Sequence, residues 1–219
     1  GGINAAVNIK GEDDSPLIHT YDTIKGGDFL GHQPPILEMC LCGPQIIQMM
    51  DRFGCTFNRT PEGNINFRRF GGTLYNRTAF CGASTGQQLL YSLDEQVRRF
   101  EVKGQVEKFE HHEFMRLIQD EQGIARGIIL MDLFTLKLDI LKADAVIIAT
   151  GGPGLIFKRS TNSTFCTGAA NGRLYMQGMH YGNGEFIQIH PTAIPGSDKL
   201  RLMSESIRGE GGRVWVYGD

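Results

Sequence analysis

The first apolar pattern with helical spacing begins near Pro34-Pro35. Proline is favoured in the first turn of a helix, and the apolar residues 36–42 continue the pattern. Gly43-Pro44 is expected to interrupt the helix, because proline lacks the N–H group that a helix interior needs. A second helical segment then covers 45–53, with Gly54 as its C-terminal stop. The pattern therefore predicts two short helices in this region.

Another helical pattern begins at Ser84. The string Ser84-Thr85-Gly86-Gln87 matches a capping box, in which the serine and glutamine side chains bind the first free backbone N–H groups. Apolar residues then recur on one face, at Leu89, Leu90, Leu93, Val97 and Phe100. We expect an amphipathic helix with a structural role.

The middle of the chain has the alternation of β-strands. Four runs are predicted as strands, at 105–110, 113–119, 125–133 and 136–141. A turn at Glu121-Gln122-Gly123 separates the second run from the third, which favours a small antiparallel meander. His111 and His112 fall within it and would point to opposite faces of a strand, so we give both a structural role.

The run Asp144–Ala149 is continuously apolar after its first residue. Such a run is typical of a strand buried on both faces of a parallel sheet. The turn T-G-G-P-G at 150–154 follows directly. Open α/β sheets bind ligands beyond the carboxyl ends of their strands, so this turn is a candidate cofactor contact, although a structural turn is an equal alternative.

Composition is that of a soluble globular protein. Of 219 residues, 41% are hydrophobic and 21% are charged, and the net charge of −2 gives no electrostatic case for binding nucleic acid. The 29 glycines are about twice the usual share of ~7%, which favours tight turns and backbone approach to a cofactor. The five cysteines include no C-x-x-C pair, so we expect no metal site.

We expect the chain to be a fragment of a longer protein. It has no initiator methionine and no charged leader, and it lacks an apolar run of about 18 residues that could cross a membrane. Both ends fall within what look like the interiors of secondary-structure elements.

The densest group of polar side chains lies within residues 185–212. Pro191 disfavours helical angles at His190, so the imidazole is presented from a stiff, extended backbone. The same stretch contains Ser204, Glu205 and Arg208. Together these side chains suit the binding of a small dianion and the movement of one proton, while each by itself is also compatible with a polar loop.

Two strings in this stretch are specific enough to compare with known families, H-P-T at 190–192 and S-E-x-x-R-G-E-G-G at 204–212. They resemble the substrate loop of the flavoprotein subunit of succinate dehydrogenase and fumarate reductase. The resemblance extends over nearly the whole chain through G-G-I-N-A-A at 1–6, Y-D-T-I-K-G-G-D-F-L at 21–30, F-N-R-T-P-E-G at 57–63, R-R-F-G-G at 68–72, A-T-G-G-P-G at 149–154 and S-T-N-S at 160–163. The string E-F-I-Q-I-H-P-T-A-I-P-G is closest to the form found with two-haem membrane anchors, as in Bacillus-type enzymes.

The resemblance implies an α/β fold. Residues 1–184 would form part of a Rossmann-like FAD-binding domain with an antiparallel β-meander inserted in it, and residues 185–219 would form the substrate loop and the start of a capping domain. No G-x-G-x-x-G follows a strand in this chain, so the pyrophosphate site is expected upstream of Gly1. The histidine that the family bonds covalently to flavin is also expected upstream, and His19 does not replace it.

The resemblance further implies which residues contact FAD. They are Gly1 and Gly2 beside the isoalloxazine ring, and a second group formed by Ala149, Thr150, Gly151, Gly152 and Ala169. Many family members carry aspartate at the position of Ala169, as T-G-D-G. Alanine supplies no carboxylate, so this contact is either lost or made by the backbone.

By resemblance, the enzyme interconverts succinate and fumarate by hydride transfer to or from FAD. His190 and Ser204 would hydrogen-bond the substrate carboxylates, and Phe70 would lie at the edge of the pocket. The family usually has threonine where Ser204 stands. Glu205 and Arg208 match the proton-delivery pair. Other substrate-binding residues of the family lie beyond this chain, which is therefore expected to be catalytically incomplete by itself.

The implied partners are an iron–sulfur subunit, a membrane cytochrome b anchor and a quinone, at the cytoplasmic face of the cell membrane. Two alternatives remain open. An L-aspartate oxidase-type FAD enzyme shares the motifs A-T-G-G and R-G-E-G-G. A non-catalytic flavoprotein-like scaffold would keep the fold without the reaction, but it would not need the four polar side chains of the substrate loop.

Overall fold

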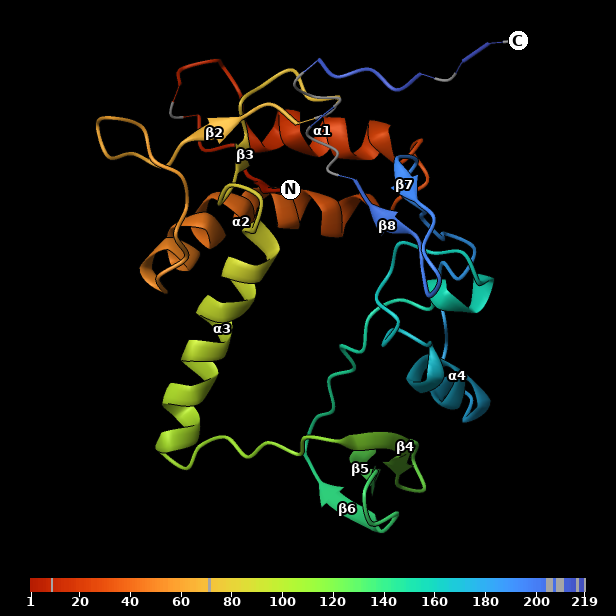
Figure 1. Ribbon diagram of the computed structural model, residues 1–219. Coiled ribbons are helices and arrows are strands. Elements are labelled where there is room, and N and C mark those ends of the chain that lie inside the picture. The colour runs from red at the N-terminus through yellow and green to blue at the C-terminus, as the bar shows by residue number, and fades with distance from the viewer. Residues whose placement is uncertain (9, 71, 204–206, 208–210, 216, 219) are drawn as a thin grey trace. The chain divides into compact units, whose positions relative to one another are not determined.

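The computed structural model describes residues 1–8, 10–70, 72–203, 207, 211–215 and 217–218. The chain divides into two compact units, residues 1–107 with 204–219 and residues 108–203. The α-helices are α1 (Pro16–Gly26), α2 (Gln33–Arg52), α3 (Thr85–Val102) and α4 (Ala169–Met176), and a 3₁₀-helix, η1, covers Gly154–Phe157. The strands are β1 (Ile3–Asn4), β2 (Phe67–Arg68), β3 (Thr78–Ala79), β4 (His112–Gln119), β5 (Ala125–Asp132), β6 (Leu138–Lys142), β7 (Ala193–Ile194) and β8 (Arg201–Leu202) (Figure 1).

The first unit is organised around a small antiparallel sheet in the order β1-β3-β2. Ala79 of β3 pairs with Ile3 on one side and with Phe67 on the other. Helices α1 and α2 lie side by side against each other (Figure 1). The hydrophobic core is formed by Ala5, Ile47, Met50, Cys55, Phe57, Phe67, Ala79 and Cys81. It joins α2 to this sheet.

Helix α1 was not predicted, although its start signal is present in the sequence. The Ser15 hydroxyl accepts a hydrogen bond from the Ile18 N–H at 3.2 Å, and Pro16 occupies the first turn. Both are standard features of a helix N-terminus. The helix ends at Gly26, and its last carbonyl groups accept hydrogen bonds from the Gly27 and Asp28 N–H groups.

The predicted interruption of the second helix is wrong. A single helix, α2, continues through Gly43 and Pro44, although the proline removes one hydrogen bond of the helical ladder. A side chain at Gly43 would lie 3.4 Å from the Cβ of Ala5. The close packing of the helix against the segment after β1 compensates for the lost bond. The predicted stop is confirmed, because the helix ends at Arg52 and Gly54 adopts a φ of +92°.

The predicted third helix is confirmed as α3, but its capping box is wrong. Ser84 precedes the helix, yet its side chain makes no capping bond and donates instead to the Cys81 carbonyl at 3.3 Å. The Thr85 hydroxyl accepts from the Cys81 N–H at 3.0 Å. The turn before the helix therefore captures both side chains, because local side-chain to backbone bonds compete with capping.

Arg77 lies at the centre of a buried ionic cluster in the first unit. Its guanidinium donates two hydrogen bonds to Asp14, at 2.7 and 3.0 Å, and a second ion pair joins it to Asp22 at 2.9 Å. The side chains of Arg77 and Asp14 are 1% and 4% exposed. His19 is buried beside them, and burial foremost, together with the Arg77 charge, lowers the pKa of its imidazole.

The cysteines are all free thiols, including one close pair in the core. The Sγ atoms of Cys55 and Cys81 are 3.6 Å apart. Burial, and next the hydrogen bond with Cys55, raise the pKa of Cys81 to about 12. This thiol is therefore protonated at neutral pH. Because the thiolate is the reactive form of cysteine, Cys81 is expected to be unreactive.

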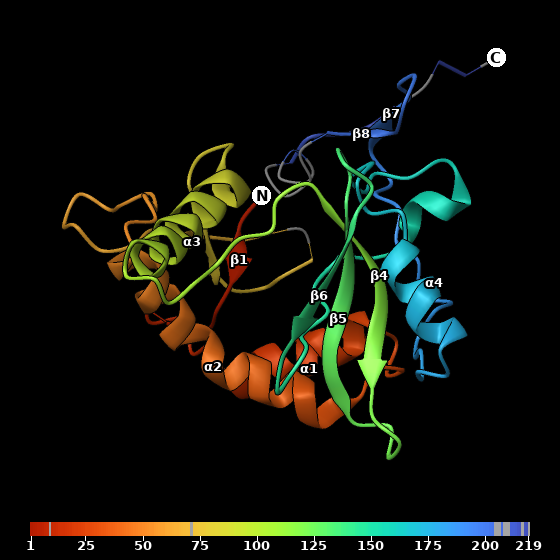
Figure 2. The same cartoon turned by 90° about the horizontal axis from the view of Figure 1, so that it is seen from below.

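The predicted β-meander is confirmed in the second unit. Strands β4, β5 and β6 form an antiparallel sheet in that order, with Leu117 opposite Ile128 and Ile129 opposite Ile140 (Figure 2). The turn at 121–123 connects β4 to β5. The first predicted strand, 105–110, is wrong: this segment forms no strand, because its alternating side chains have no neighbouring strand to pair with.

The predicted buried strand Asp144–Ala149 is also wrong in this structure. The segment has no ladder partner among the described residues, and Ile147 is 89% exposed. A parallel strand needs neighbours on both sides to satisfy its backbone groups and to cover its apolar side chains. The described strands form antiparallel sheets only.

Within the described part of the chain, no helix combines the length and the apolar character that crossing a membrane requires. The same residues bring together no group of three or more His, Cys, Asp or Glu side chains that could hold a metal ion.

Candidate functional site

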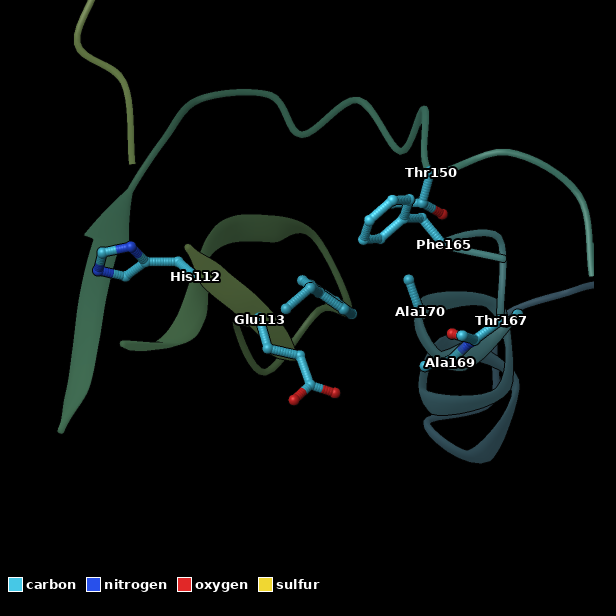
Figure 3. Close-up of a pocket in the computed structure, with 9 residues that line it drawn as sticks. His112, Glu113, Thr150, Phe165, Thr167, Ala169 and Ala170 are labelled. Atoms are coloured by element: carbon cyan, nitrogen blue, oxygen red, sulfur yellow. The ribbon is translucent and has the colours of Figure 1, made fainter. Parts of the chain in front are cut away.

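A pocket of about 380 Å³ in the second unit contains two of the predicted FAD contacts, Thr150 and Ala169. Figure 3 shows the α4 residues Ala169 and Ala170 on one wall and Glu113 of β4 on the facing wall, with Thr150 and Phe165 nearby. The remaining lining residues are His112, Phe114, Thr167 and Gly168.

The glycines of the T-G-G-P-G turn fold it onto the segment that precedes α4. Gly151 adopts a φ of +77°, and a Cβ at this position would lie 2.8 Å from the Sγ of Cys166. Only glycine fits both the backbone angle and the space. The turn therefore places Thr150 at the pocket and brings the segment around Cys166 against it.

The beginning of α4 forms the second part of the pocket wall. Gly168 precedes the helix, and the Thr167 hydroxyl accepts a hydrogen bond from the Ala169 N–H at 3.4 Å. The first N–H groups of a helix have no partner inside the helix and can bind polar ligand atoms. Ala169 offers only backbone polar atoms, and its N–H already has the Thr167 hydroxyl as a partner, so its contact with the cofactor stays a prediction.

The β4 wall was missed by the sequence analysis. Glu113 supplies a carboxylate to the pocket, and His112, to which we had given a structural role, lines it too. His112 also has structural contacts, since its Nδ1 lies 2.6 Å from the Glu110 carbonyl and its Nε2 lies 3.4 Å from Asp139. No local signal could have found this wall, because it is created by the packing of α4 against β4.

The residues of this pocket fit part of a dinucleotide cofactor. Its volume falls at the lower end of the range of about 300–1,000 Å³ found for ligand sites. Two hydroxyls, a carboxylate and the N–H groups at the start of α4 suit a ligand with sugar hydroxyls, and Phe165 adds an apolar surface.

The predicted contacts Gly1 and Gly2 lie in the first unit. A Cβ on Gly2 would lie 2.3 Å from the Cγ2 of Thr78 and 2.8 Å from the Ala79 carbonyl oxygen. The requirement for glycine at this position therefore comes from packing against β3. Gly1 is exposed, and its carbonyl accepts a hydrogen bond from Arg68 at 2.7 Å.

His190 is held by the threonine of the H-P-T string. The Thr192 N–H donates to the His190 Nδ1 at 3.2 Å, and the Thr192 hydroxyl lies 3.0 Å from the same atom. An Nδ1 that accepts a hydrogen bond from an N–H group carries no proton, so the neutral ring has its proton on Nε2. The Thr161 hydroxyl accepts a hydrogen bond from the His190 N–H at 3.4 Å. The imidazole is thus oriented with Nε2 as its donor.

Phe70, the other described residue of the predicted substrate site, belongs to the first unit. Its N–H donates to the Thr73 hydroxyl at 3.0 Å, and that hydroxyl in turn donates to the Phe70 carbonyl at 2.9 Å. These bonds tie the backbone of Phe70 to the Thr73 side chain. Ser204, Glu205 and Arg208 lie outside the described residues, so their roles remain predictions.

Comparisons with known proteins bear on the family, the fold and the cofactor of this chain. Residues 1–217 match the family model of the FAD binding domain. The succinate dehydrogenase flavoprotein subunit of Bacillus subtilis (strain 168) is 61% identical over 219 residues, which is 100% of this chain and 37% of the relative. A variant of Escherichia coli quinol fumarate reductase is similar in structure, with a TM-score of 0.86 and 33% identity over 96% of this chain and 34% of that chain. A quinol-fumarate reductase with menaquinol molecules gives a TM-score of 0.87 and 34% identity over 96% of this chain and 35% of that chain.

The chain spans about a third of the length of these relatives. The predicted fold class, an α/β FAD-binding domain, is confirmed by the family match and by the structural neighbours. The family model covers nearly every residue of the chain. The chain therefore belongs to the FAD binding domain family, whose cofactor is FAD.

Proposed function

We propose that the chain is part of the flavoprotein subunit of a succinate dehydrogenase or fumarate reductase. The observation that carries the proposal is the 61% identity to the Bacillus subtilis succinate dehydrogenase flavoprotein subunit, which extends over every residue of the chain. In such an enzyme, bound FAD supplies the hydride chemistry that interconverts succinate and fumarate.

The pocket between α4 and β4 is proposed to hold part of the FAD. The hydroxyls of Thr150 and Thr167 would form hydrogen bonds with hydroxyl groups of the cofactor, and the backbone at Ala169 and Ala170 would contact its polar atoms. The backbone at 149–152 and at Gly1 and Gly2 would complete the contacts.

His190 is proposed to bind a carboxylate of the substrate through its Nε2 proton. The bond from the Thr192 N–H to Nδ1 supports this role, because it fixes the donor atom before substrate arrives. Ser204 would donate a second hydrogen bond to the dicarboxylate, and Phe70 would border the pocket. Glu205 and Arg208 would deliver a proton to the substrate site or take one from it. The Glu205 carboxylate would allow the arginine, a poor proton carrier by itself, to take part in this transfer.

The proposed partners follow from the same relatives. Two of the similar structures are quinol-fumarate reductases, one of them with menaquinol. We infer that this chain passes electrons to an iron–sulfur subunit and, through a membrane cytochrome b anchor, to or from quinone. The flavoprotein would then lie at the cytoplasmic face of the membrane and be attached through its partner subunits.

The test is dye-linked oxidation of succinate by the full-length protein loaded with FAD. We expect turnover that malonate inhibits, and a fall in kcat/KM of about 100-fold in His190→Ala, as expected for the loss of a hydrogen bond to a charged group. Thr192→Val removes the hydroxyl but keeps the backbone N–H that binds Nδ1, so kcat/KM should fall by only about tenfold. His180→Ala, at an exposed position of the same unit, is the matched control and should keep full activity.

Two outcomes would contradict the proposal. Turnover of aspartate with oxygen, without dye-linked succinate oxidation, would identify an L-aspartate oxidase-type enzyme. The absence of a yellow chromophore and of any activity would identify a non-catalytic scaffold.

A further inference from the structure

Helix α4 is attached to the free edge of β4 by a side chain that takes the place of a neighbouring strand. Among the described strands, β4 pairs with β5 alone, so its other edge has no strand to bind its backbone groups. The Leu117 N–H donates to the Gln177 Oε1 at 3.0 Å, and the Gln177 Nε2 donates to the Leu117 carbonyl at 2.9 Å. One amide side chain thus satisfies both backbone groups of this edge residue. Figure 2 shows α4 lying along β4.

A second attachment lies one helical turn earlier on α4. Arg173 donates a hydrogen bond to the Phe114 carbonyl, and its Nη2 lies 2.9 Å from the Oε1 of Glu113. Gln177 directly follows the last residue of α4 and stands four positions after Arg173, so the two side chains share one face of the helix and reach the same strand edge.

A β-bulge brings both attachment points to that edge. In a regular strand, Phe114 and Leu117 would present their backbone groups to opposite edges, because the direction alternates with each residue. The pairing of β4 with β5 shifts register between Phe114 and Arg116, which leaves Met115 as an extra residue. The carbonyls of Phe114 and Leu117 therefore both point toward α4. The edge of β4 is therefore hydrogen-bonded to the helix side chains at two positions, Phe114 and Leu117.

The Arg173 attachment adjoins the pocket that is proposed to hold FAD. Ala169 on one wall lies one turn before Arg173, and Glu113 on the other wall pairs with Arg173 directly. The separation of the walls thus depends on how closely α4 is held to β4. We propose that Arg173 and Gln177 are positioning residues that hold α4 against β4 and so set the affinity of this pocket for FAD. This inference rests on the proposed function of the pocket.

The test is titration of flavin-free, full-length protein with FAD, followed by quenching of FAD fluorescence, at pH 8 and at pH 5. Gln177→Glu keeps the acceptor for the Leu117 N–H but places a carboxylate oxygen against the Leu117 carbonyl. We expect its Kd to be about tenfold above that of the wild type at pH 8. At pH 5 the ratio of the two Kd values should fall to about twofold. The introduced carboxyl group faces the Leu117 carbonyl oxygen, which raises its pKa above the usual value of about 4.3. Once protonated, the carboxyl group donates a hydrogen bond to that carbonyl, as the glutamine amide does.

Three further variants separate positioning from general stability. Gln177→Met removes both hydrogen bonds and should weaken FAD binding about tenfold at both pH values, with Glu113 and Arg173 unchanged. Arg173→Lys keeps the charge but cannot bind Glu113 and Phe114 through one planar group, so its Kd should rise about fivefold. Gln122→Glu adds the same charge to the exposed turn of the same sheet and should bind FAD as the wild type does.

Amide hydrogen exchange at Leu117, measured without flavin, gives an independent reading of the edge contact. We expect exchange at least about tenfold faster in Gln177→Met than in the wild type. Unchanged FAD affinity in both Gln177 variants, with normal binding by the wild type, would overturn this inference alone. Failure of the wild type to bind FAD would overturn the proposed function as well. The comparison of Leu117 exchange between the wild type and Gln177→Met would then still show whether Gln177 protects the edge of β4.

Discussion

The two units of the chain are stabilised in different ways. Of the 13 buried hydrophobic residues described, 10 belong to the first unit, and only Leu117, Leu130 and Ala170 belong to the second. The first unit also buries the ionic cluster of Arg77 and Asp14. The second unit depends on the ladder of its meander and on polar side chains that bind backbone, such as Gln177.

This difference matters for function. In the second unit, most of the apolar run at 144–149 is exposed, and so is Phe165, which lines the pocket between α4 and β4. A ligand that binds only the folded state adds to its stability, and this contribution counts for more in a unit with few buried side chains. The first unit, by contrast, is expected to hold its shape through its own core.

The largest effect is expected from breaking the ionic cluster of the first unit. Arg77→Met leaves the buried Asp14 carboxylate without its partner and should lower the free energy of unfolding by about 3–5 kcal/mol. Urea unfolding followed by circular dichroism measures this change. The control is Arg59→Met, which removes an exposed ion pair with Asp51 and should cost less than about 1 kcal/mol. Equal effects of the two variants would contradict the importance of burial.

A smaller effect is expected from truncating an isoleucine in each unit. Ile47→Ala, in the core, should cost about 2–5 kcal/mol, because it removes buried methyl groups and leaves a cavity. Ile140→Ala, on the exposed face of β6 at 65% exposure, should cost less than about 1 kcal/mol. Urea midpoints of the two variants provide the comparison. A larger loss at Ile140 would mean that the second unit has a core that the burial pattern does not reveal.

The smallest effect is a pH dependence in the first unit. Burial lowers the pKa of His19, so the folded protein resists protonation where the unfolded chain, with a pKa of about 6.5, takes up a proton. The unfolded state then binds more protons, and stability should fall as the pH drops below about 6.5. In His19→Gln this part of the loss should vanish, while the exposed His180→Gln should behave as the wild type does. Melting temperatures between pH 7.5 and pH 5 test this, and parallel curves for wild type and His19→Gln would refute it.

Local patterns predicted the helix α3, the strands of the meander and, apart from a false interruption, the helix α2. Alternation at 113–141 and the turn at 121–123 gave the meander, and the apolar face after Ser84 gave α3, because both signals depend on residues close in sequence. The errors arose where a distant partner decided the outcome. Gly43-Pro44 stays helical because α2 packs on Ala5, and the run 144–149 forms no strand because no described neighbour pairs with it.

The sequence by itself determined the family, the FAD cofactor and the T-G-G-P-G turn, because these depend on residue types at fixed spacing along the chain. It also singled out Thr150 and Ala169. Only the tertiary structure placed Glu113 opposite Ala169 and joined Arg173 and Gln177 to the edge of β4. These contacts connect residues about 60 positions apart. Apart from the Glu113 carboxylate, the partners of Arg173 and Gln177 are backbone groups, which every residue has, so residue identity along the chain does not indicate which ones will meet.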